Sequence, residues 1–409
     1  MKLRLTVCTT LLILSSSAIN AQGFQVNFQG QKQQGMGLAG TGLYVDGSSL
    51  FYNPGSIALS DENSFNVNFT PIFANTLYVD SATGDGYRTN SPMGTPFSAY
   101  GLFQFKKDAP LKLGIAVYTP FGSTVEWEDN WIGRFALTRL QLSSVFIQPT
   151  VSYRITEKLG LGLGLIVSTG SVNLQRDLPV QFADGTYASA ELSGKALGFG
   201  LNAGIQFQAT ENLGFGFTYR SRINMSVKSG SADFSVPGSL ESNFPDGPFE
   251  ATLPLPQVFT LGASYKFGEK WTAVLDINYV GWQAYDTLAF DYETNTASLT
   301  DTRSARDYKS IFAFRGGVSY DVIKSLTLRL GGGFGFTPVQ DGYLTPETPD
   351  ANRIYGTFGI SYKIGEHFCI DASLYYTQMK RGDTNQETNL SGTYATKAIA
   401  PGIGLIYKL

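Results

Sequence analysis

The chain has 409 residues and a formal net charge of −3, and 15% of its residues are charged, 13% are aromatic and 46 are glycine. Soluble proteins have about 25% charged residues, so this composition favours a chain whose exterior is largely apolar. The small negative charge provides no basic field that would attract phosphates, and no nucleic-acid partner is expected.

The first residues have the layout of a secretory signal peptide. Lys2 and Arg4 precede an apolar stretch at 5–14, and small and polar residues follow as far as Ala21. We expect residues 1–21 to be removed from the mature protein. Cys369 is then the only cysteine, so no intramolecular disulfide can form although the chain leaves the reducing cytoplasm.

After residue 21, no stretch approaches the roughly 18 to 20 consecutive apolar residues that a membrane helix requires, which excludes a helical membrane protein. Segments of about ten residues instead carry apolar side chains at alternate positions, which is typical of strands in a membrane barrel. The clearest segment runs from Trp271 to Tyr279, and similar ones lie at 213–220 and 368–376. The sequence therefore predicts an all-β protein.

The links between these segments alternate in length. Short links, such as 156–158 and 268–270, alternate with long polar links at 122–137, 229–252, 291–308, 338–352 and 380–394. Bacterial outer-membrane barrels place short turns in the periplasm and long loops outside the cell, and they have an even number of strands. Counting strands gives about 14, so we expect residues 63–409 to form a transmembrane antiparallel β-barrel in the outer membrane of a Gram-negative-type bacterium.

Residues 22–62 do not alternate, and they are rich in glycine and polar side chains. The lumen of a barrel of about 14 strands is wide enough to need filling or to conduct water, so we interpret this segment as an N-terminal hatch that plugs the lumen. Gly35, Gly37 and Gly40 also match the dinucleotide motif G-x-G-x-x-G, but no apolar strand precedes them and no βαβ unit follows. No cofactor is expected.

The hatch also contains the residues of a specific resemblance. The glycine-rich stretch from Gln34 to Gly42 is followed by Asn53 and Pro54. Together they resemble the hatch of the FadL family, whose Asn-Pro-Ala motif is matched except that Gly55 stands in place of alanine. Further similarity to this family follows in the same order along the chain, at 118–122, 131–134, 255–262, 278–282 and 346–353. We expect Asn53, Pro54 and Gly55 to gate the lumen.

The resemblance implies a barrel of about 14 strands that transports long-chain fatty acids or similar hydrophobic small molecules without an energy source. It also implies a route: capture among the outer loops, an apolar pocket inside the barrel, and lateral release where the third strand bends near the hatch. That strand corresponds to residues 111–119 here, with Gly114 within it and Pro120 after it, and both residue types weaken a regular ladder. We expect a monomer surrounded by outer-membrane lipid.

Four arginines are candidates for contact with a substrate carboxylate. The alternation places Arg315 and Arg329 in the lumen, and the short turn between their strands makes them near cross-strand neighbours. Buried cations must be paired or hydrated, so these arginines either form salt bridges with carboxylates of the wall or hatch, or bind a substrate carboxylate through their bidentate fork. Arg220 and Arg222, on another strand, have the same two interpretations.

Two other functions are alternatives. A general diffusion porin would have an open, polar lumen, and a structural or adhesion barrel would act through its loops. An enzyme is not expected, because His367 is the only histidine and lies in a predicted periplasmic turn, where it cannot serve a nucleophile in the lumen. We assign no catalytic residues, and no metal site because the sequence has no Cys/His cluster.

Overall fold

The structure is a computed structural model that describes residues 23–106 and 108–409. The predicted signal peptide, residues 1–21, lies outside the described residues. Within the described part of the chain, no helix has both the length and the apolar character needed to cross a membrane.

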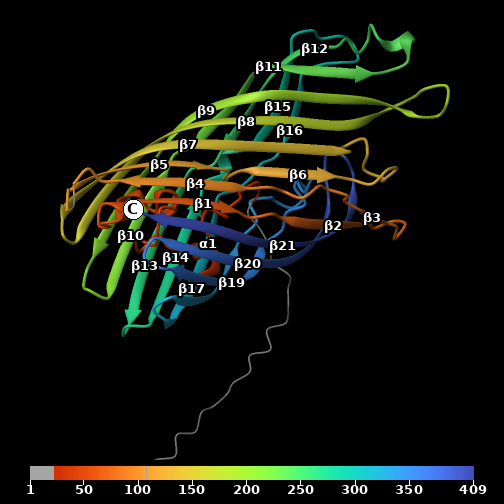
Figure 1. Cartoon of the computed structure of the whole chain (residues 1–409). Coiled ribbons are helices and arrows are strands. Elements are labelled where there is room, and N and C mark those ends of the chain that lie inside the picture. The colour runs from red at the N-terminus through yellow and green to blue at the C-terminus, as the bar shows by residue number, and fades with distance from the viewer. Residues whose placement is uncertain (1–22, 107) are drawn as a thin grey trace, which may run out of the picture.

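Fourteen antiparallel strands form a closed barrel, which confirms the fold class and the strand count expected from the sequence. Each strand pairs with its neighbours around the wall, and the long strands cross the molecule side by side (Figure 1). In order around the wall, the strands are β1 (Ser64–Phe69), β4 (Phe97–Phe103), β5 (Leu111–Tyr118), β7 (Arg139–Thr156), β8 (Leu159–Gln181), β9 (Tyr187–Gln208), β10 (Leu213–Arg220), β13 (Val258–Phe267), β14 (Trp271–Val280), β17 (Ile311–Ile323), β18 (Leu326–Gly335), β19 (Arg353–Ile364), β20 (Phe368–Thr384) and β21 (Ser391–Lys408).

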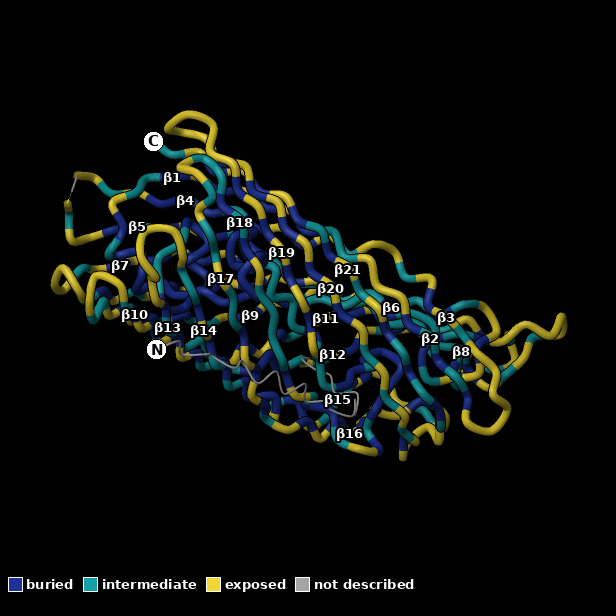
Figure 2. Tube along the Cα trace, turned by 90° about the horizontal axis from the view of Figure 1, so that it is seen from below, coloured by how far each residue is buried: buried dark blue, intermediate teal, exposed yellow. Residues whose placement is uncertain are grey.

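The alternating sequence pattern explains why these segments form the wall. On β14, Trp271 and Leu275 are exposed, whereas Val274, Asp276 and Asn278 are buried. The same alternation is found on β10 and β20, and it is visible along the strands as alternating buried and exposed positions (Figure 2). One face of each strand therefore presents apolar side chains outward, as contact with lipid requires, and the other face lines the lumen.

The seam between β1 and β21 closes the barrel. Ser64 pairs with Lys408 at one end of this antiparallel ladder. Beyond it, the amide of Leu409 donates to the carbonyl of Asn63 at 3.0 Å, and the ammonium group of Lys408 pairs with the carboxylate of Glu62. The first and last strands of the chain are therefore fastened to each other.

Strands extend into two of the predicted long loops, where they occupy residues 229–235 and 247–252 of the loop 229–252 and residues 291–292 and 302–305 of the loop 291–308. These strands are β11 (Ile223–Ser235), β12 (Gly247–Leu255), β15 (Thr287–Tyr292) and β16 (Thr302–Ala305). β9 pairs with β10 near one end and with β11 near the other, so β11 continues the line of β10. We call the extension formed by β11, β12, β15 and β16 the side sheet. The expectation of loops was wrong here because apolar side chains, Phe249 and Phe290 among them, form a buried cluster of their own.

Three further strands and two 3-10 helices lie at the long-loop end of the barrel. They are β2 (Phe73–Asp80), β3 (Gly86–Arg88), β6 (Gly122–Glu126), η1 (Gly238–Leu240) and η2 (Trp282–Ala284). β2 follows β1 and pairs with β21, and β6 follows β5 and pairs with β7. The first and third strand positions of the wall are thus each made of two shorter strands.

Residues 23–63 precede the first strand and contact strands of the wall, and they include the described part of residues 22–62, for which a hatch was predicted. They form three short helices, α1 (Gln31–Gly35), α2 (Ser49–Tyr52) and α3 (Pro54–Ile57). α1 contacts β18 to β21, and α3 contacts β7 to β10, so the segment reaches both sides of the barrel wall. We call residues 23–63 the hatch segment below.

Glycines on both partners let the backbone of the hatch segment touch the wall. A Cβ atom added to Gly35 would lie 2.8 Å from the Cα of Gly359 on β19, and a Cβ added to Gly359 would lie 2.8 Å from the Cα of Gly35. A Cβ on Gly55 would lie 2.6 Å from the carbonyl oxygen of Gly204 on β9. These positions require glycine because there is no space for a side chain.

We predict that Gly359→Ala will loosen the hatch segment, because the added methyl group would overpack against the backbone of Gly35. Overpacking of this kind costs about 1–3 kcal/mol. The measurement is the rate at which a protease releases residues 23–63 from detergent-solubilised barrel, with heat-modifiable migration as the check that the barrel is folded.

Gly356→Ala is the matched control, because a Cβ at this position on the same strand would meet nothing within 4 Å. We expect this variant to behave like the unmodified protein. Equal protease sensitivity of the two variants would contradict the packing described here.

Candidate functional site

The third strand position of the wall is interrupted between β5 and β6. β7 pairs with both strands, through Tyr118 with Phe146 and Gly122 with Ser143. Pro120 lies at the interruption, where it has no N–H to donate to a ladder. On the other side β4 pairs with β5 as far as Tyr118, whereas β6 has hydrogen bonds on this side only at its far end, where the amide of Asn90 donates to the carbonyl of Glu126 at 2.7 Å. The wall therefore lacks a continuous ladder beside β6.

Gly114 does not take part in this interruption, contrary to the expectation from the sequence. It lies within a regular part of β5, paired with Leu102 on one side and Thr150 on the other. Its lack of a side chain instead makes room for Leu50 of the hatch segment, because a Cβ on Gly114 would lie 2.5 Å from a methyl carbon of Leu50. The interruption comes later, between Tyr118 and Gly122, where Pro120 lies.

The start of the hatch segment supplies hydrogen bonds at the interruption. The amide of Val26 donates to the carbonyl of Pro120 at 2.8 Å, and the amide of Gly122 donates to the carbonyl of Phe24 at 3.1 Å. These bonds flank an antiparallel bridge between Gln25 and Phe121. The broken edge of the wall is thus paired with the hatch segment instead of with β4.

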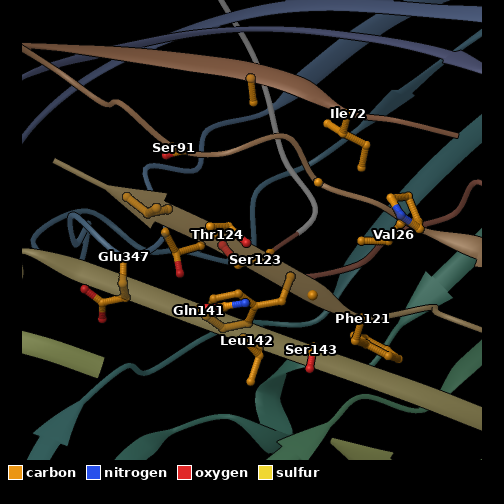
Figure 3. Close-up of a pocket in the computed structure, with 18 of the residues that line it drawn as sticks. Val26, Ile72, Ser91, Phe121, Ser123, Thr124, Gln141, Leu142, Ser143 and Glu347 are labelled. Carbon is orange, nitrogen blue, oxygen red and sulfur yellow. The ribbon is translucent and has the colours of Figure 1, made fainter. Parts of the chain in front are cut away.

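A cavity of about 480 Å³, here called the wall cavity, lies beside the interruption. Its lining comes from the hatch segment, the link 91–96, β6, β7 and the loop residues 347–350 (Figure 3). Small-molecule pockets usually have volumes of about 300–1,000 Å³. The interruption is therefore accompanied by a space of the size that a small ligand needs.

A second space of about 80 Å³, here called the apolar cavity, lies next to the wall cavity. Phe24, Phe121 and Leu142 line both. The rest of its lining is mostly aliphatic or aromatic and includes Leu140, Leu174, Met225, Val227, Leu253, Leu255, Leu288 and Phe290. Among the described residues that line it, Glu347 is the one with a formal charge. This lining suits a hydrophobic molecule.

A buried ion pair borders both cavities. Glu347 lines the two cavities and is 8% exposed. Arg306 Nη2 donates to its Oε1 at 2.7 Å, and Arg306 Nη1 lies 4.0 Å from Oε2 of Glu387. Burial by itself would lower the pKa of Arg306, but the Glu347 carboxylate and the neighbouring Tyr285 raise it above its usual value. The guanidinium group therefore keeps its charge.

Asn53 joins two parts of the hatch segment to the wall. It is fully buried, and the two N–H groups of its Nδ2 have three acceptors within reach: the carbonyl oxygen of Thr41 at 2.8 Å, that of Ile205 at 3.0 Å and Oε1 of Gln206 at 3.0 Å. Its Oδ1 accepts from the amide of Gly55 at 2.9 Å and so caps α3. One side chain thus satisfies backbone and side-chain groups on three segments.

Pro54 and Gly55 extend this contact. Pro54 is the first residue of α3, a position at which the missing N–H is not needed and the fixed φ favours the helix. Ser152 on β7 donates to its carbonyl oxygen at 2.7 Å. Gly55 packs against Gly204, as described above, which accounts for glycine at this position where the family motif has alanine. The three predicted gating residues therefore form one contact between hatch segment and wall.

Arg315 and Arg329 both point into the lumen, but they are not cross-strand neighbours. Arg315 pairs in register with Gly333, and Arg329 pairs with Ser319. The prediction of adjacency was wrong because the turn pairs Asp321 with Thr327, which leaves the two arginines at different distances from the turn. On its other side Arg315 lies opposite Asp276 of β14.

Arg329 belongs to a network of charged and polar side chains near the short-turn end. Its Nη1 donates to Ser361, which in turn donates to Asp371. Lys32 of the hatch segment lies 4.0 Å from Asp371 and 3.5 Å from Asp46. Arg329 is therefore linked to a carboxylate of the wall through Ser361. Lys32 was not among the predicted site residues, because it lies in a segment without strand periodicity.

Arg220 and Arg222 differ from each other. Arg220 is stacked 3.9 Å over the ring of Phe51 and donates to the carbonyl of that residue at 2.9 Å. Together with Arg315 it lines a space of only about 30 Å³, which holds two or three waters at roughly 10–15 Å³ each. Arg222 is exposed and donates to Asn224, so its predicted place in the lumen is not found. Neither Arg220 nor Arg315 lines the wall cavity or the apolar cavity.

Comparisons with known proteins agree with this architecture. A family model described as outer membrane protein transport protein (OMPP1/FadL/TodX) matches residues 12–408. The chain belongs to the FadL/TodX family. Among FadL/TodX relatives, the long-chain fatty acid transport protein of Escherichia coli K12 is 21% identical over 90% of each chain, and the 47 kDa outer membrane protein of Pasteurella multocida is 22% identical over 98% of each chain. The resemblance seen in the sequence is confirmed.

Solved structures of FadL/TodX proteins have the same fold. A FadL homologue from Pseudomonas aeruginosa superposes with a TM-score of 0.82 at 18% identity, covering 94% of this chain and 99% of that chain. The toluene transporter TbuX of Ralstonia pickettii superposes with a TM-score of 0.70 at 15% identity, covering 93% of this chain and 98% of that chain. At these identities the likeness establishes the fold.

We predict that Asn53→Ala will destabilise the hatch segment much more than Asn75→Ala. Loss of the Asn53 amide removes this partner from the buried carbonyl of Thr41 and the buried amide of Gly55, and an unpaired buried group costs about 1–3 kcal/mol. Asn75, by contrast, is exposed and its amide donates once, to Thr89. Hydrogen exchange of the hatch amides, measured in detergent, should rise for the first variant alone. Similar exchange in both variants would contradict the bridging role of Asn53.

Proposed function

We propose that this protein carries hydrophobic small molecules across the outer membrane without an energy source. The observation that supports this function best is the pair of adjacent cavities beside the interrupted strand. The apolar cavity is lined mainly by apolar side chains, and the wall cavity lies where the wall lacks a continuous ladder. The FadL/TodX family consists of outer-membrane transport proteins for hydrophobic compounds. The names of relatives suggest two substrate classes, long-chain fatty acids and toluene.

The proposed route passes through the two cavities in order. A molecule captured among the long loops occupies the apolar cavity first, because that cavity lies among strands of the side sheet, including β11, β12 and β15. It then passes Phe24 and Phe121, which line both cavities, into the wall cavity. Release is lateral, between the link 91–96 and β6, into the surrounding membrane. The long loops are extracellular and the short turns periplasmic in this scheme.

The hatch segment is the proposed gate. Residues 24–26 pair with the broken edge at 120–122, so displacing them would open the wall cavity further. Asn53, Pro54 and Gly55 hold the rest of the segment against β7 and β9. A loss of these contacts should therefore lower uptake at a matched amount of folded protein, and Asn53→Ala serves as the variant for this measurement as well.

The filled lumen argues against a general diffusion porin. Almost every residue from Gly30 to Gly42 is buried, and the hatch segment contacts strands on both sides of the barrel. The outward rows of apolar side chains suit a monomer in contact with lipid. We therefore place the function in the cavities and not in a water-filled pore.

We predict that Leu142→Trp will reduce uptake of a hydrophobic substrate by at least about tenfold, which corresponds to about 1.4 kcal/mol. Leu142 lines both cavities, so the larger ring would obstruct the route between them. Leu374→Trp is the control, because Leu374 is exposed on the outer face of β20. Uptake is measured in cells that express equal amounts of folded barrel. Equal uptake by the two variants would overturn the proposed route.

A further inference from the structure

We propose that Glu347 makes this site selective for hydrophobic molecules that lack a carboxylate. It does so by covering Arg306 and by presenting its own negative charge to both cavities. This inference rests on the proposed function and narrows its substrate class, from hydrophobic molecules in general to uncharged ones such as hydrocarbons, aromatic rings and long-chain alcohols.

The charges that line the two cavities support this selectivity. The described residues around the wall cavity include two carboxylates, Glu347 and Asp350, and one cation, Arg353. Those around the apolar cavity include Glu347 alone. The lining thus has more negative than positive charge. A carboxylate that leaves water for such a space meets repulsion from like charge and gains no free cation.

Arg306 would be a suitable partner for a substrate carboxylate if it were accessible. Its side chain is 7% exposed and does not line either cavity, whereas the carboxylate that bonds to it does. On its other side, Glu387 lies 4.0 Å away and accepts a hydrogen bond from Ser304 at 2.7 Å. Glu347 therefore occupies the position that a substrate carboxylate would take. Displacing it would leave a buried carboxylate without its partner, which is strongly unfavourable.

The other cations near the route are also engaged or separate from it. Arg353 lies 3.9 Å from Asp350, which accepts further hydrogen bonds from the amide of Gly23 and the hydroxyl of Thr337, each at 3.1 Å. Arg220 and Arg315 line the separate space of about 30 Å³ described above. A fatty acid in the wall cavity therefore meets one described cation, Arg353, which already has Asp350 as its charged neighbour, and in the apolar cavity it meets no described cation.

The test compares two ligands that differ only in the head group, dodecan-1-ol and dodecanoate, at a pH near 8 where the acid is ionised. Equilibrium binding of each to the full-length protein, purified in detergent, gives their relative affinity. We expect the alcohol to bind at least about tenfold more tightly than the acid, since each tenfold corresponds to about 1.4 kcal/mol and like-charge contact costs several times that amount. Equal or tighter binding of dodecanoate would overturn the inference.

Variants identify the residue responsible. Glu347→Ala uncovers Arg306 and should raise the affinity for dodecanoate about tenfold while the affinity for dodecan-1-ol changes little. Glu347→Gln keeps the size of the side chain and should change selectivity in the same direction, so a folding defect in the first variant does not decide the outcome. Adding Arg306→Ala to Glu347→Ala should remove the gain. Unchanged selectivity in both Glu347 variants would overturn the role of this residue.

Glu387→Ala is the matched control. Glu387 also approaches Arg306, but it does not line either cavity, so this variant should keep the preference for the alcohol. A loss of preference equal to that of Glu347→Ala would show that the charge of Arg306, and not the position of Glu347, sets the selectivity. Binding of neither ligand by the unmodified protein would instead overturn the proposed function, a result distinct from binding both equally.

Discussion

The rest of the structure depends on one contact, in which the backbone of the hatch segment lies directly against the backbone of the inner wall. The helices of this segment have four or five residues each, too few for a hydrophobic core of their own. Glycine pairs such as Gly35 with Gly359 remove the side chains that would otherwise separate the segment from the wall. Dispersion contacts and hydrogen bonds then act at short range along the whole interface.

This close packing determines where ligand space is left. The hatch segment contacts β7 to β10 and β18 to β21, and the wall cavity and the apolar cavity lie beside it, toward the side sheet and the interrupted third strand. The same segment supplies the backbone groups that pair with Pro120 and Gly122. The element that fills the barrel is therefore also the element that completes its wall, and moving it would change both.

The alternation in the sequence predicted which side of the wall most strand residues face, including the inward direction of Arg315 and Arg329. This was possible because a period of two residues arises within a single strand and does not depend on its neighbours. Their relation across the turn was predicted wrongly, since register depends on which residues the turn pairs. The extension of β11 and β15 into a side sheet was missed for a similar reason. It depends on an apolar cluster that joins Phe249 to Phe290, and no local pattern connects them.

The ion pair at the cavities could not be predicted from sequence. Arg306 follows a short strand in one predicted loop and Glu347 lies in another, so no spacing relates them. Asn53 and Pro54, in contrast, were identified because a family motif marks them. Motifs of this kind report local backbone requirements, whereas a pair formed between two folded loops is visible only in three dimensions.

The seam between β1 and β21 has a consequence for the order of assembly. The wall closes only when the last eighteen residues of strand, Ser391–Lys408, are available to pair with the first strand. The hatch segment leads directly into that first strand, and Glu62 at its end is joined to Lys408. Enclosure of the hatch segment and closure of the barrel therefore belong to the same late step. In a chain that lacks its final strand, the barrel would stay open and the hatch segment would not be enclosed.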